Sequence, residues 1–176
     1  MKSTQPDTPI QTNPPNPILL AVNPGTRYLG VALFRGACLI EWRIKVVKRA
    51  SPDGKSAHVA AIIDALVEQH QPHILILKKP HPRRTSVVLN RLTLEITRLG
   101  VHHGLRVYAF TTGVMARLLS SESHASKRAL AQYVVAEHPM LQRELNRELA
   151  AHHAYHSRMF EAVALGMAAR RYLGRI

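Results

Sequence analysis

Three short apolar runs follow one another in the first third of the chain. They cover residues 18–23, 28–36 and 37–47 and are rich in β-branched and aromatic residues, which is typical of strands. Pro24-Gly25 lies between the first two runs, and Arg35-Gly36 lies at the border of the second and third. Because such pairs mark tight turns, the pattern predicts three consecutive antiparallel strands.

Helical and strand-like patterns then alternate. After a loop at residues 51–54, apolar residues recur every three or four positions, which predicts a helix over residues 55–70. The uninterrupted apolar run at residues 73–77 is typical of a strand covered on both faces. The remaining predicted elements are a helix over residues 86–103, a strand over 105–110, a short helix from Thr111 or Thr112 to Leu119, and helices over 125–138 and 155–173.

The order of these elements, β-β-β-α-β-α-β-α-α-α, predicts the fold class. A strand meander followed by strand–helix alternation is typical of a three-layer α/β domain, with a mixed central sheet and helices on both faces. We expect this domain to span residues 18–176, with its site at the carboxyl ends of the central parallel strands. Residues 1–17 are proline-rich and polar and are expected to form a flexible tail.

The charge balance narrows the class of partner. Lysine and arginine outnumber aspartate and glutamate by 24 to 11, so the formal net charge is +13 with neutral histidines. This favours an anionic partner, for which nucleic acid and an anionic membrane surface are the common choices. The single cysteine, Cys38, excludes an internal disulfide and fits a reducing compartment. No apolar run reaches the roughly 18 residues that span a bilayer, so we expect a cytoplasmic protein without a membrane partner.

Four motifs occur in a suggestive order. They are NPGTRYLG at residues 23–30, HILILKKPH at 73–81, FTTGVMARLLSSESHASKRALAQYV at 110–134 and YHSRMFEAVALGMAAR at 155–170. In this order, and with this arrangement of strands, the chain resembles the RuvC family of Holliday-junction resolvases in the RNase H-like superfamily. The resemblance extends from about residue 18 to residue 173 and implies an RNase H-like fold.

The resemblance also implies where a catalytic site lies and which of its acids are replaced. Family enzymes cut phosphodiesters with two divalent ions held by carboxylate or histidine ligands. At the matching positions Asn23 replaces the first Asp, and Lys78 or Lys79 replaces the Glu at a strand end. Arg158 replaces the next acid, and Glu161 alone remains. We therefore expect a degenerate site with a buried cluster of Lys78, Arg158 and Glu161 and no cofactor, with Mg²⁺ or Mn²⁺ only if cleavage survives.

Cations near this site are candidates for contact with nucleic acid. The loop at residues 78–86 contains prolines that favour an extended chain, and a further pair of cations begins a predicted helix near residue 127. Solvated surface charge is the alternative interpretation. The predicted phosphate contacts are Arg27, Lys78, Lys79, Arg83, Arg84, Lys127 and Arg128.

Two further groups of residues have alternative interpretations. His153 and His156 lie three apart, and with Glu161 they could hold Zn²⁺ or Mn²⁺, although the spacing matches no zinc signature. Asn23 could be a metal ligand through its carbonyl oxygen. Alternatively, it is an ordinary turn residue before Pro24-Gly25. Two aromatic residues on the predicted strands are expected in the core rather than at a base-stacking surface, namely Phe34 and Trp42.

Three functions are compatible with the sequence. The first is a catalytically degenerate RuvC-like homodimer that recognises branched or structured DNA, with RNA as the alternative nucleic acid. The second is an active, divergent endonuclease that rebuilds its site from Glu161, Asn23, either Glu95 or Glu122, and nearby histidines. The third is a subunit of a larger nucleoprotein assembly. The absence of acids at the strand ends favours the first.

Overall fold

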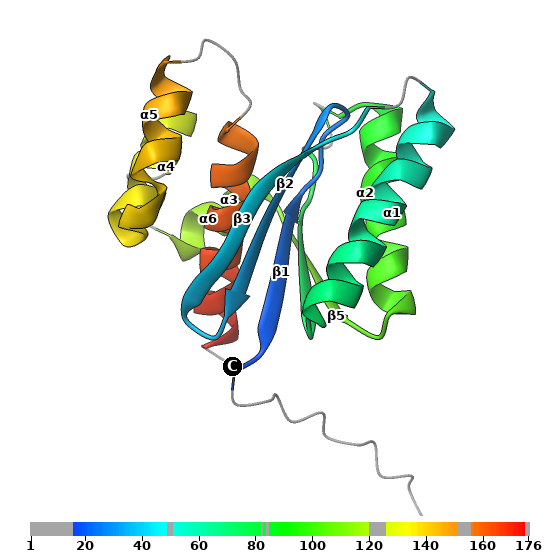
Figure 1. Ribbon diagram of the computed structural model, residues 1–176, viewed down its shortest axis with the longest axis horizontal. Helices are drawn as coiled ribbons and strands as arrows, with labels where there is room; N and C mark the ends of the chain where they lie inside the picture. Colours follow the sequence, from blue (N-terminus) through cyan, green and yellow to red (C-terminus); the bar gives the residue numbers. More distant parts are fainter. Residues whose placement is uncertain are drawn as a thin grey trace, which may run out of the picture.

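The computed structural model of the protein describes residues 16–48, 51–81, 83, 85–119, 126–150 and 156–174. A five-stranded sheet with the order β3-β2-β1-β4-β5 forms the middle layer (Figure 1). Its strands are β1 (Ile18–Asn23), β2 (Tyr28–Arg35), β3 (Cys38–Val46), β4 (Ile74–Lys78) and β5 (Arg106–Phe110). The first three strands are antiparallel, whereas β1, β4 and β5 run parallel. The predicted meander and mixed sheet are therefore confirmed.

Helices cover both faces of this sheet, as predicted (Figure 1). The helices α1 (Pro52–His70) and α2 (Val87–His102) cover one face, and α3 (Thr112–Leu118), α4 (Lys127–Glu137) and α6 (Ser157–Leu173) lie on the other. Side chains of β1 alternate between the two layers, because successive residues of a strand point to opposite faces. None of the described helices is long and apolar enough to cross a membrane. Residues 1–15 of the predicted tail lie outside the described residues.

The helix α6 is buried on nearly all sides. Every residue from Met159 to Ala169 is buried, against β1, β2, α3 and α4. Small residues let the sheet come close: a Cβ at Gly166 would lie 2.2 Å from the Phe34 ring. Phe34 is fully buried, and Trp42 packs half-buried against the same core, so both are core residues as predicted.

Hydroxyl caps fix where four helices begin. Each cap accepts a hydrogen bond from the backbone N–H three residues later, and the caps are Ser51, Ser86, Thr111 and Ser126. The cap at Ser51, followed by Pro52 at the first helical position, starts α1 three residues before its predicted start. Thr111 rather than Thr112 caps α3.

One helical segment is absent from the sequence prediction. No element is predicted between residues 138 and 155, yet a short 3₁₀-helix (Pro139–Leu141) leads into α5 (Gln142–Ala150). This segment reads QRELNRELA and buries Leu145 alone of its residues, so its apolar periodicity is too sparse to reveal a helix. Leu141 and Leu145 attach it to the core next to α4.

The start of α6 approaches the sheet most closely at a glycine of β2. A Cβ at Gly30 would lie 2.0 Å from the carbonyl oxygen of Arg158 and 2.5 Å from its carbonyl carbon. These are backbone atoms, which cannot turn aside as a side chain can. Gly30 pairs with Asn23 in the β1–β2 ladder, so this approach also sets the distance between α6 and the end of β1.

We expect Gly30→Ala to lower the free energy of unfolding by about 1–3 kcal/mol, because the methyl group overpacks against the α6 backbone. Urea unfolding followed by circular dichroism measures this change. Gly113→Ala is the matched control, since its Cβ would meet only Thr111 Oγ1 at 3.9 Å and alanine favours the helix. Equal stabilities of the two variants would contradict the role assigned to Gly30.

Candidate functional site

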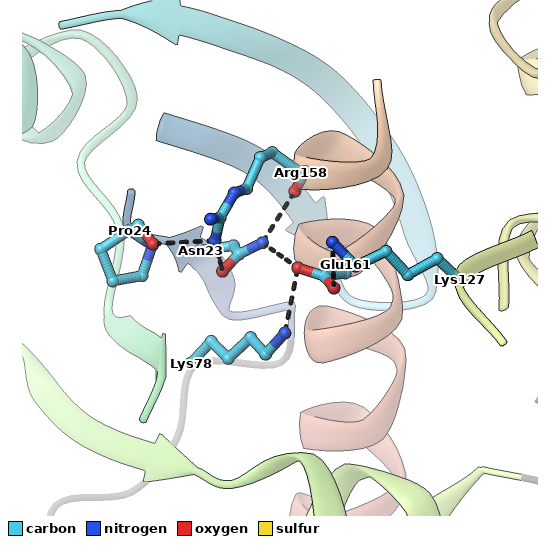
Figure 2. Close-up of polar contacts among 6 residues, drawn as sticks. All are labelled: Asn23, Pro24, Lys78, Lys127, Arg158 and Glu161. Atoms are coloured by element: carbon cyan, nitrogen blue, oxygen red, sulfur yellow. Dashed lines mark hydrogen bonds and ion pairs between the residues drawn. The ribbon is translucent and has the colours of Figure 1, made fainter. Parts of the chain in front are cut away.

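Two parallel strands bring their last side chains to the same edge of the sheet. The strand β1 ends at Asn23 and β4 ends at Lys78. Core residues of these strands that face α6 are Leu19, Ala21, Ile74 and Ile76. Continuing this alternation places Asn23 and Lys78 on the α6 side, as Figure 2 shows, whereas Lys79 is exposed. Lys78 is therefore the residue that takes the strand-end position.

Glu161 lies at the centre of this edge, in the second turn of α6, and is only 6% exposed. Its Oε2 accepts a hydrogen bond from Asn23 Nδ2 at 2.6 Å and lies 3.0 Å from Lys78 Nζ (Figure 2). The first residue of α4, Lys127, brings its Nζ to 4.0 Å from Oε1. One buried carboxylate is thus surrounded by two ammonium groups and an amide.

Arg158 closes the site one helical turn before Glu161. Its Nη1 donates a hydrogen bond to the Pro24 carbonyl at 3.2 Å and lies 3.5 Å from Asn23 Oδ1. Its own backbone carbonyl accepts a hydrogen bond from Asn23 Nδ2 at 3.3 Å. The Asn23 side chain is 1% exposed and joins two side chains of α6, so it belongs to this network rather than to the turn that follows β1.

The network holds Glu161 in its charged form. Burial alone raises the pKa of Glu161, but the Lys78 ammonium, the Lys127 ammonium and the Asn23 amide together bring the pKa below its ordinary value. With Arg158 beside this pair, cations outnumber the single carboxylate. The resulting positive field favours an anion, such as a backbone phosphate, at this edge of the sheet.

A cavity of about 460 Å³ opens next to the network. Of the residues selected from the sequence, those lining it are Asn23, Lys78, Lys79, Lys127, Arg158 and Glu161. His81 and Thr112 line it too, although no motif had marked them as site residues. The sequence held a signal for both, because His81 lies in the cationic loop and Thr112 follows β5 at the same edge.

Other predicted contact residues do not line this cavity. Arg27, Arg83 and Arg128 are exposed, and none of them is part of the cavity wall. Arg84 lies outside the described residues. Contact between these four residues and nucleic acid therefore remains a prediction about the surface around the cavity.

The donor set at this edge does not fit Mg²⁺ or Mn²⁺. Among the described residues, Glu161 is the only carboxylate lining the cavity, and Lys78 and Asn23 already contact one of its oxygens. The carbonyl oxygen of Asn23 faces the Arg158 guanidinium. A hard divalent cation needs several free oxygen ligands, and here it would have to displace an ammonium group to gain one.

The alternative metal ligands do not converge either. In the described ranges, no group of three His, Cys, Asp or Glu side chains could hold a metal ion. His156 lies beside Glu148, with Nδ1 3.6 Å from Oε2, while His153 lies outside the described residues. Glu95 does not line the cavity, and Glu122 is also outside the described residues.

The lowered pKa predicts how the site responds to acid. A charged Glu161 stabilises the fold above its unfolded pKa of about 4.3, and this contribution is lost as the pH falls through the lower folded value. Between about pH 5 and pH 2, the wild type should therefore lose more free energy of unfolding than Glu161→Gln. Urea unfolding at a series of pH values measures the difference.

The exposed Glu68 on α1 provides the control for this measurement. Glu68→Gln removes the same charge from a solvated position and should leave the acid response of the wild type unchanged. Parallel pH curves for the wild type and Glu161→Gln would show that the carboxylate titrates alike in the folded and unfolded chains, against the prediction.

Comparisons with known proteins place this site within a known fold. No family model matches the sequence, and no curated protein matches it significantly. Among solved structures, Thermus thermophilus RuvC in complex with Holliday junction substrate matches with a TM-score of 0.69 at 14% identity, covering 90% of this chain and 95% of that chain. A second T. thermophilus RuvC structure gives a TM-score of 0.69 at 15% identity, covering 90% of this chain and 96% of that chain. The yeast mitochondrial Holliday junction resolvase matches with a TM-score of 0.59 at 8% identity, covering 94% of this chain and 82% of that chain. The chain therefore has the α/β fold of RuvC, as the sequence motifs predict.

Proposed function

We propose that the protein binds branched DNA, such as a four-way junction, and does not cleave it. The fold supports this proposal, because the structures that share it include a RuvC bound to a Holliday junction. A net charge of +13 supports an anionic partner. The exposed free thiol of Cys38 favours the reducing cytoplasm as its location.

The contact between Lys78 and Glu161 carries the proposal. Metal-dependent cleavage of a phosphodiester uses bound divalent ions to activate water and stabilise the leaving oxygen. Here the Lys78 ammonium lies 3.0 Å from the carboxylate that such ions would need, and the Asn23 amide hydrogen-bonds the same oxygen at 2.6 Å. A lysine at this place adds positive charge without activating water, which favours binding over cleavage.

Exposed cations around the cavity provide the DNA-binding surface. Lys79 and Lys127 lie on its wall, and the Lys127 side chain is 61% exposed. Arg83 and Arg128 are exposed on the neighbouring loop and helix. Such residues contact phosphates whatever the base sequence, so the proposed selectivity is for the shape of the branched backbone.

An apolar stripe on α2 supports a homodimer. Val87, Leu94 and Val101 are 85%, 62% and 64% exposed and follow one another every seven residues, which is the spacing of a helix–helix seam. Leu94 lies midway between the two valines. A two-fold axis through Leu94 would pair Val87 of one copy with Val101 of the other, as a self-complementary interface requires.

We expect the protein to bind a labelled four-way DNA junction more tightly than a matched linear duplex, and to leave both uncut in Mg²⁺ and in Mn²⁺. Parallel native and denaturing gels measure binding and nicking. Metal-dependent cuts that disappear in Glu161→Gln would replace the proposal with an active, rebuilt nuclease. Preference for a matched RNA would change the substrate, and no binding to either nucleic acid would favour the role of an assembly subunit.

A matched pair of charge reversals locates the binding surface. Lys79→Glu should weaken junction binding roughly five- to tenfold and reduce its salt dependence, since one phosphate contact and its released counterion are lost. Arg35→Glu makes the same charge change at the end of β2, which pairs with the start of β1 at the other edge of the sheet. It should therefore have a much smaller effect. Equal losses in the two variants would mean that net charge, and not this surface, governs binding.

The α2 stripe yields a separate prediction about assembly. Sedimentation equilibrium should find a dimer for the wild type and a monomer for Leu94→Glu, because a charge at the centre of the seam cannot be buried unpaired. Met140→Glu is the control, since Met140 is 54% exposed in the 3₁₀-helix away from the stripe. A monomeric wild type, or a dimer that persists in Leu94→Glu, would contradict the proposed interface.

A further inference from the structure

A second cavity lies at the other edge of the sheet, where β1 and β4 begin. Its volume is about 650 Å³, which exceeds that of the cavity beside Glu161. The turn at Gly36, the last turn of α4 and the last turns of α6 complete its wall. The proposed contact with DNA at the carboxyl edge leaves this cavity without a role.

The cavity combines an apolar lining with a few polar groups. Leu19 and Ile74 contribute the starts of the two strands, and Met167 and Leu173 contribute one side of α6. Sites for small molecules are typically cavities of roughly 300–1,000 Å³ with mainly apolar walls and a small number of placed polar groups. The size is therefore that of a small-molecule site, and the lining combines apolar with charged side chains.

Two neighbouring arginines line this cavity and differ in their contacts. Arg171 donates hydrogen bonds to the Leu118 carbonyl at 3.1 Å and to the Tyr133 hydroxyl at 2.6 Å. Arg170 lies with its Cζ 5.8 Å from the centre of the Phe34 ring, and its guanidinium makes no hydrogen bond or ion pair with the described part of the chain. Within the described residues the donors of this half-buried guanidinium therefore have no acceptor, and a ligand in the cavity can supply one.

His138 adds a second polar group next to Arg170. Its ring meets Phe34 edge to face, with 5.9 Å between ring centres. Burial lowers the pKa of His138, and Arg170 lowers it further against the opposing effect of Glu137, so the ring is neutral near pH 7 and the field it experiences is positive. The Glu137 carboxylate, which also lines the cavity, and the carbonyl ends of α4 and α6 oppose an anion here, and the two arginines offset them.

We propose that this cavity binds a small organic anion whose carboxylate or phosphate group is attached to an apolar body. The anionic group pairs with the Arg170 guanidinium, which can donate two parallel hydrogen bonds to it. The His138 imidazole lies next to that pair as a neutral donor or acceptor. The apolar body covers Leu19, Ile74 and Met167 at the bottom of the cavity.

The test titrates the full-length protein with 2-naphthoate, 2-naphthyl phosphate and the neutral 2-naphthalenemethanol, followed by ¹H–¹⁵N NMR. We expect saturable shifts at Gly36, His138 and Gly174 with one or both anions, and roughly tenfold weaker binding of the neutral probe. Whichever anion binds more tightly identifies the ligand as a carboxylate or a phosphate. Shifts confined to residues around Lys78 and Lys127 would place the anion at the other site and overturn the proposal.

Two variants test the cavity from different sides. Arg170→Gln should weaken anion binding roughly tenfold, whereas Arg147→Gln, on exposed α5, should keep it. Ala37→Trp fills the cavity mouth from an exposed turn and should block the probes while Arg170 stays in place. Thermal melts show that each variant is folded. Unchanged affinity in both Arg170→Gln and Ala37→Trp would overturn the proposal, whatever the outcome of the DNA experiments.

Discussion

The contact between the Glu161 carboxylate and the Lys78 ammonium is the constraint on which the carboxyl edge of the sheet depends. Burying an isolated carboxylate costs several kcal/mol, and removing one partner of a buried pair typically costs about 3–5 kcal/mol. Lys78 and Asn23 offset that cost from the ends of β4 and β1. These two contacts therefore anchor the start of α6 to two central strands. They also occupy the carboxylate oxygen that a metal would need.

The fold around this pair is built for close approach. Gly30 leaves room for the Arg158 carbonyl, which in turn accepts a hydrogen bond from Asn23, so backbone packing and side-chain polarity meet at the same carbonyl group. At the other edge, the Arg170 guanidinium has no comparable partner among residues 16–174 that the structure describes, although it belongs to the same helix. The buried helix α6 thus contributes hydrogen-bonded and ion-paired side chains near its start, and near its end it places the Arg170 guanidinium at a cavity.

Sequence patterns anticipated the elements that bury continuous apolar surface and missed those that do not. The strands and α6 follow from segments rich in apolar residues, whereas α5 buries one leucine among polar residues and gives no such signal. In the site, the motifs selected Asn23 and Glu161, but only the two-residue period of β4 distinguishes Lys78 from Lys79. That Asn23 bonds to Glu161 depends on a helix 138 residues away, a contact that no local pattern encodes.

A lysine in place of a metal changes what the site can do with a phosphate. A divalent ion attracts the phosphate, lowers the pKa of bound water and stabilises the leaving oxygen, whereas an ammonium group supplies only the attraction. Because that charge belongs to the protein, the proposed binding of a DNA backbone at this edge does not require bound Mg²⁺. The remaining acid then has a structural reason to persist, since without Glu161 the Lys78 ammonium would lie half-buried with no carboxylate beside it. Under the proposed function, folding explains why an acid lies at this edge, without a role for Glu161 in catalysis.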